Sequence, residues 1–149
     1  MTYLAKPDQT YEEHVLAAYQ AWKEITTVVR PLIDCVADSA GISSERLVKS
    51  SLLIVILHDI GKMCLPFQAM MQDIAAGKRP RYERNYRHEV ASFPYVLLAA
   101  RSLDKLEGGA VSPCCCLEEM AVLGHHRPVN GALQSFSREV QYDVSDKLP

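Results

Sequence analysis

Five histidines and one aspartate of this sequence have the side chains and the placement of a metal site. They are His14, His58, Asp59, His88, His125 and His126. Neutral imidazole and carboxylate are ligands that Zn, Mn, Fe, Co and Ni accept, and a carboxylate can bridge two ions that act on one phosphate ester. A single histidine more often caps a helix or lies in a core, but the pairs His58-Asp59 and His125-His126 favour a shared site. We therefore predict one metal site that hydrolyses phosphate esters.

The two pairs differ in what their surroundings imply. His58 and Asp59 directly follow the apolar run from Leu52 to Leu57, where a carboxylate is costly unless it is paired or bound to a cation. His125 and His126 follow Gly124, and the side chains of two neighbouring residues point in different directions. One of these histidines could bind a metal while the other binds a second ion or the substrate.

His14 falls in the first turn of a predicted helix. Thr10 and Glu13 form a capping-box pattern, and apolar residues at helical spacing follow them. Pro31 interrupts or kinks this helix, and Gly41 ends it.

His58 and Asp59 lie at the end of the next predicted helix. Ser43 or Ser44 caps that helix, and its last turns are apolar on nearly every side, which is typical of a central, buried helix. Gly61 is expected to adopt the left-handed turn that ends it.

Three further helices complete the predicted fold. One begins near Pro66, and another runs from about Tyr86 with His88 in its first turn and Pro94 as a point of bending. The remaining boundary signals are Gly108 and Gly109 at the end of that helix, and Ser112, Pro113 and Gly124 around the last one. Five helices and no convincing strand predict an all-α fold, with residues 1–149 forming a single domain.

Composition and charge narrow the class of protein. The chain has 149 residues, 48% of them hydrophobic and 23% charged, which is ordinary for one soluble globular domain. There is no long apolar segment for secretion or membrane insertion, and three of the five cysteines are adjacent, so we expect a cytoplasmic protein without a membrane partner. The net charge of -2 requires that any nucleic acid be held by a local patch or a metal. The strongest basic cluster is Lys78, Arg79, Arg81, Arg84 and Arg87, and a solvated loop is the preferred interpretation of it unless it lies beside the metal site.

The run His58-Asp59-Ile60-Gly61-Lys62, with His14 upstream, resembles the motif of the HD superfamily of metal-dependent phosphohydrolases. Three later segments resemble the HD nuclease domain of the CRISPR-associated helicase-nuclease of type I systems. They are Phe67-Gln68, the run from Arg87 to Ser92, and His125-His126. The resemblance spans roughly residues 11–128.

This resemblance implies a helical HD bundle that cleaves single-stranded DNA, as an endonuclease or exonuclease, with two divalent metal ions such as Mn, Co, Ni, Fe, Zn or Mg. It implies that His14, His58 and Asp59 hold one ion, and that Asp59 bridges to a second. His88, His125 and His126 would complete the coordination of the second ion.

The resemblance also implies further roles and partners. Asp59 and Lys62 would be catalytic, with Lys62 facing the scissile phosphate, although a lysine there is also explained as a cation that stabilises a helix end. Arg84 and Arg87 are predicted to bind substrate because they belong to the basic cluster, not because of the resemblance. The partners would be single-stranded DNA, a helicase domain or protein, and the CRISPR surveillance complex in antiviral defence.

One metal-binding residue that is usual in this family has no clear counterpart in the sequence. Family members supply another metal-binding aspartate downstream of the paired histidines, and the late aspartates here, Asp143 and Asp146, lie in no strong apolar helix pattern. Either the chain lacks the C-terminal helices, or water completes the first metal position.

No Gly-rich phosphate loop with a Lys-Ser or Lys-Thr ending occurs, so a helicase motor would belong to another segment or protein. The alternatives are an HD phosphohydrolase acting on a small nucleotide and an HD scaffold with impaired catalysis.

Overall fold

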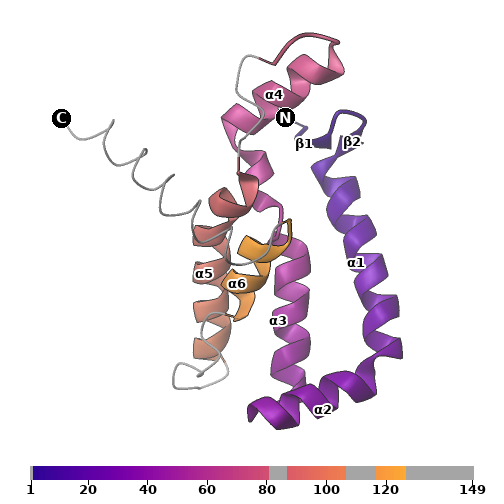
Figure 1. Ribbon diagram of the computed structural model, residues 1–149, viewed down its shortest axis with the longest axis vertical. Helices are drawn as coiled ribbons and strands as arrows, with labels where there is room; N and C mark the ends of the chain where they lie inside the picture. Colours follow the sequence, from indigo (N-terminus) through magenta and orange to yellow (C-terminus); the bar gives the residue numbers. More distant parts are fainter. Residues whose placement is uncertain (1, 81–86, 107–116, 127–149) are drawn as a thin grey trace, which may run out of the picture.

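The computed structural model describes residues 2–80, 87–106 and 117–126, and in these ranges the chain is almost entirely helical (Figure 1). The prediction of an all-α fold is confirmed. The elements are β1 (Leu4–Lys6), β2 (Gln9–Thr10), α1 (Tyr11–Val28), α2 (Arg30–Ala40), α3 (Ser44–Leu57), the 3-10 helix η1 (Ile60–Met63), α4 (Leu65–Ala75), α5 (His88–Leu106) and α6 (Leu117–Gly124). The predicted boundary signals at positions 108, 109, 112 and 113 lie outside the described residues.

Local signals set the ends of the first three helices. Thr10 and Glu13 form a capping box at the start of α1, and the Ser43 side chain accepts a hydrogen bond from a backbone N–H in the first turn of α3. Pro31 lies in the first turn of α2, where a residue without an N–H is tolerated, and the chain breaks at Val29 between α1 and α2. Gly41 ends α2 with a left-handed φ of 66°.

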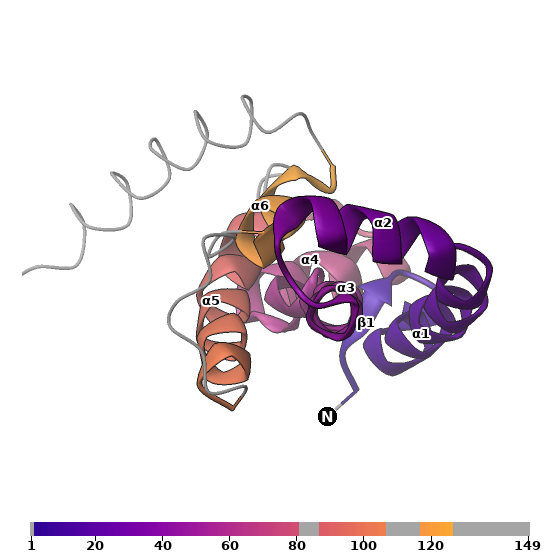
Figure 2. The same cartoon turned by 90° about the horizontal axis from the view of Figure 1, so that it is seen from below.

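Helix α3 is central but not fully buried. It lies between α1 on one side and α5 and α6 on the other in both views (Figure 1 and Figure 2). Ser50 is the one residue of α3 that is buried, and Ile56 is 39% exposed, so the prediction of a buried helix is wrong. The physical reason is that α1 has no buried residue of its own and therefore covers α3 only in part.

A two-stranded hairpin precedes α1, although the sequence showed no convincing strand. Its strands pair Leu4 with Thr10 in antiparallel register and are too short to show an alternating pattern. The side-chain amide of Gln68 in α4 substitutes for a strand: Oε1 accepts from Leu4 N at 2.8 Å, and Nε2 donates to Leu4 O at 2.8 Å. The same Nε2 donates to Lys62 O at 2.7 Å, so Gln68 connects β1 to η1.

No single helix among the described residues has the length and apolar character needed to cross a membrane. A bent pair, Ser44–Met63 with Leu65–Ala75, meets that test only when its two parts are taken together.

Candidate metal centre

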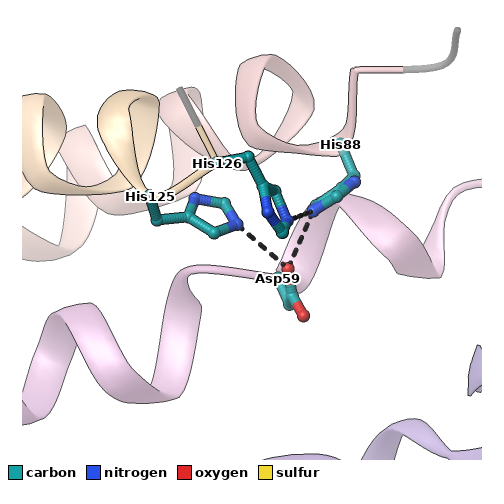
Figure 3. Close-up of side chains that lie close together, drawn as sticks. All are labelled: Asp59, His88, His125 and His126. Carbon is teal, nitrogen blue, oxygen red and sulfur yellow. Dashed lines mark hydrogen bonds and ion pairs between the residues drawn. The ribbon is translucent and has the colours of Figure 1, made fainter. Parts of the chain in front are cut away.

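The side chains predicted to bind metal all meet at one place, although they come from four helices. Four of them are drawn in Figure 3. His14 comes from the first turn of α1, His58 caps the C-terminal end of α3, and Asp59 follows it directly. His88 is the first residue of α5, and His125 and His126 follow the end of α6. Each ligand therefore projects from a helix end.

The first group of ligand atoms, the His14 set, consists of His14, His58 and Asp59. His14 Nε2 lies 2.9 Å from Asp59 Oδ2, and His58 Nε2 lies 3.3 Å from the same oxygen. The two Nε2 atoms are 3.4 Å apart. Ligand atoms about 2.0–2.1 Å from a common ion stand roughly 3.0–3.5 Å from one another. These three atoms therefore have the spacing of a coordination sphere.

The second group, the His88 set, consists of Asp59, His88, His125 and His126. It uses the other carboxylate oxygen. His88 Nε2 lies 2.9 Å from Asp59 Oδ1 and 3.0 Å from His126 Nε2, and His125 Nε2 lies 3.5 Å from Oδ1 (Figure 3). Asp59 is thus shared by both sets, with one oxygen directed to each.

Two buried atoms of the His88 set lack a hydrogen-bond partner among the described residues. They are Asp59 Oδ1 and His125 Nε2, which lie 3.5 Å apart. Buried polar atoms without a partner are rare because leaving them unsatisfied costs about 1–3 kcal/mol or more. A divalent ion would satisfy a carboxylate oxygen and an imidazole nitrogen together, so the residues present fit the metal that this donor set implies.

Backbone carbonyls fix the orientation of two of the imidazoles. His58 Nδ1 lies 2.9 Å from Val55 O, and His125 Nδ1 lies 2.6 Å from Val122 O. A carbonyl oxygen only accepts hydrogen bonds, so Nδ1 carries the proton in each ring and the Nε2 lone pair is free for a metal. Both carbonyls belong to a last helical turn, where backbone acceptors have no partner within the helix.

Asp59 is 2% exposed and remains ionised. Burial alone would raise its pKa, but the side chains of His125, His58, His88 and Lys62 outweigh burial and hold the pKa far below its usual range. Lys62, also buried, brings Nζ to 2.6 Å from Oδ2. Lys62 therefore lies in the site itself, beside the oxygen of the His14 set.

Burial keeps some of the imidazoles in the neutral form that metals bind. It lowers the pKa of both His14 and His126. His125 differs: burial would lower its pKa, but the carboxylate of Asp59 and the carbonyl of Val122 raise it overall. The site is thus organised around one negative charge.

The predicted substrate-binding arginines are placed differently or not described. The Arg87 side chain is 8% exposed and its Nε donates to Glu89, which is also buried. Arg87 therefore does not present a free cation to substrate, and the expectation for it is corrected: its charge neutralises Glu89 beside His88. Arg84 and Arg81 lie outside the described residues, whereas Lys78 and Arg79 are exposed after α4.

Gly61 has a different role from the predicted one. The glycines with positive φ in the described part of the chain are Gly41 and Gly77, so Gly61 does not form a left-handed turn. A Cβ at Gly61 would lie 2.2 Å from His88 O and 2.8 Å from Ser92 N. Glycine is needed because the backbones of η1 and α5 approach too closely for any side chain.

One neighbour of the site carried no signal in the sequence. Tyr11, at the start of α1, places its hydroxyl 3.4 Å from Ile56 O. Burial, and secondly the charge of Asp59, raise the pKa of Tyr11 to about 12. The phenol therefore stays protonated beside the carboxylate.

Comparison with known proteins agrees with this geometry. A sequence model of the family described as Cas3, HD domain matches residues 13–147. The chain belongs to the Cas3 HD-domain family. This confirms the resemblance to an HD nuclease domain, and the match extends beyond the expected limit near residue 128.

A curated relative of this Cas3 HD domain is the CRISPR-associated endonuclease Cas3-HD of Pyrococcus furiosus. The two are 28% identical over 134 residues, which cover 88% of this chain and 52% of the relative. The chain thus spans about half the length of the curated relative that it matches. No solved structure matches the chain.

Proposed function

We propose that this Cas3 HD domain is a metal-dependent nuclease that cleaves phosphodiesters of single-stranded DNA. The observation that carries the proposal is the position of Asp59, which directs Oδ2 to the His14 set and Oδ1 to the His88 set. A carboxylate shared between two ligand sets is the arrangement that places two divalent ions on one phosphate. The family membership and the name of the Pyrococcus relative support nuclease chemistry in CRISPR defence.

The residues of the site divide the chemistry among them. Divalent ions such as Mn, Co, Ni, Fe, Zn or Mg would polarise a phosphoryl oxygen and lower the pKa of water. Asp59 and the five histidines would hold these ions, and the carbonyl-bonded His58 and His125 would keep their Nε2 atoms directed inward. Lys62 would offset negative charge on the phosphoryl group during attack. Water is the attacking group, because the side chains gathered here are ligands and one ammonium.

Substrate would approach from the imidazole side of the centre. The side chains of His14, His58 and His125 are each 18–20% exposed, whereas that of Asp59 is 3% exposed. Single-stranded DNA can bring one phosphate to this partly exposed side of the centre, because its backbone is not held in a duplex. We also propose that a helicase and a CRISPR surveillance complex supply this strand in the cytoplasm.

The direct test is cleavage by the purified chain supplied with Mn, Co or Ni. We expect circular single-stranded DNA to be cut and cleavage to stop when a chelator removes the ions, while duplex DNA of the same sequence is cut far more slowly. Cutting of the circle would identify endonuclease activity. Intact single-stranded DNA together with hydrolysis of free nucleotides would instead identify a nucleotide phosphohydrolase, and a chain that binds no metal would be a scaffold.

Lys62→Met tests the division of roles. We expect metal stoichiometry to be retained, with equal or tighter binding, because the substitution removes an ammonium 2.6 Å from Asp59 Oδ2. Cleavage of single-stranded DNA should fall roughly 100-fold, as when one preorganised group that stabilises transition-state charge is lost. Lys105→Met, at an exposed position of α5, is the matched control and should change neither quantity. Unchanged cleavage in Lys62→Met would reassign Lys62 to a purely structural role.

A further inference from the structure

We infer that Ser92 is a positioning residue that, together with Gly61, sets the place of His88 relative to Asp59. Ser92 lies one turn after His88 in α5 and is 0% exposed. Its hydroxyl accepts a hydrogen bond from Gly61 N at 2.9 Å and donates one to His88 O at 2.8 Å. One buried hydroxyl therefore joins two segments that are 31 residues apart in sequence.

The two segments joined in this way are those that carry the His88 set. Gly61 follows Asp59 by two residues in the chain, and His88 begins the helix that contains Ser92. The missing side chain of Gly61 lets its backbone press against the same carbonyl that Ser92 contacts, since a Cβ there would lie 2.2 Å from His88 O. The hydrogen bonds of the Ser92 hydroxyl and the close approach of the Gly61 backbone together fix the spacing between η1 and α5.

The consequence concerns one ligand set and not the other. Asp59 directly precedes η1 and His88 begins α5, so the two residues lie on opposite sides of the contact between η1 and α5. Their Oδ1 and Nε2 atoms are 2.9 Å apart. The His14 set draws its ligands from α1 and the end of α3, so its spacing does not depend on α5. Loss of the Ser92 hydroxyl should therefore weaken the second ion selectively. This inference rests on the proposed function, because the His88 set must hold an ion.

Ser92→Ala is the test, measured as metal binding to the purified full chain by titration with Mn. The wild-type chain is expected to take two ions, and in Ser92→Ala the dissociation constant of one ion should rise roughly 10- to 100-fold while the other stays unchanged. The matched control is Ser102→Ala in the same helix. Ser102 donates to Leu98 O at 2.8 Å in the same way, but it is exposed.

Four outcomes overturn the inference in different ways. Two ions bound with unchanged affinities would show that Ser92 does not position His88, while leaving the proposed nuclease intact. Equal weakening of both ions would show a general structural role. A wild-type chain that binds no metal would remove the proposed function and this inference together. If Ser92→Ala does not fold, Ser92→Cys fills nearly the same volume with a weak donor and acceptor, and unchanged Mn binding in that variant would also contradict the inference.

Discussion

Replacing Asp59 with asparagine is expected to abolish metal-dependent nuclease activity and to remove most metal binding. The substitution keeps the shape of the side chain but removes the charge that both ligand sets share. The carboxylate is ionised throughout the neutral pH range, because its pKa lies far below the usual value, so the charge is lost at every assay pH. Turnover should fall by at least about 100-fold, a loss at the upper end of what the removal of supporting groups alone produces.

Metal-dependent stabilisation separates the Asp59 prediction from simple misfolding. A ligand that binds only the folded chain raises its melting temperature, so wild-type protein should melt higher when Mn is added. Asp59→Asn should fold but show little of this increase. Asp38→Asn, an exposed carboxylate on α2, is the control and should behave like wild type. If Asp59→Asn kept both the Mn-dependent increase and its activity, a bridging role for Asp59 would be disproved.

Local signals explain why residues that gather at the candidate metal centre could be picked out from the sequence. Each ligand lies at a helix end, and helix ends are marked by residues that act on their own backbone, such as the Thr10 capping box before His14. The division into the His14 set and the His88 set followed from the family resemblance, and the structure groups the same atoms.

The supporting contacts could not be predicted because they depend on packing between distant segments. Gly61 has the residue type of a helix stop, yet its role is the close approach of α5, which involves residues about 30 positions later. Arg87 belongs to a basic run that suggests substrate binding, and only the fold shows that its guanidinium is paired with the carboxylate of Glu89. Gln68 pairs with Leu4 across 64 positions, a distance over which no periodicity carries information.

Arg46→Met is expected to lower the free energy of unfolding by about 3 kcal/mol, because breaking a buried ion pair leaves charges without compensation. Arg46, in the first turn of α3, donates from Nη1 to Glu118 Oε1 at 2.7 Å and from Nη2 to Asp104 Oδ1 at 2.7 Å. Its side chain is 12% exposed and that of Glu118 is 1% exposed. These bonds join α3 to α5 and α6, the helices of the His88 set. Thermal unfolding should show a decrease in melting temperature of roughly 6–12 °C.

The location of this charge decides the size of the effect. Arg30→Met is the matched control: Arg30 pairs with Asp34 at 3.0 Å, but both side chains are 48% exposed, so little change is expected. In Arg46→Met, the carboxylate of Glu118 stays buried without the cation that compensates its charge. Adding Glu118→Gln should remove part of this deficit, because the amide carries no charge to compensate. A deficit of the same size with and without Glu118→Gln would mean that packing of the arginine stem, rather than its charge, holds α3, α5 and α6 together.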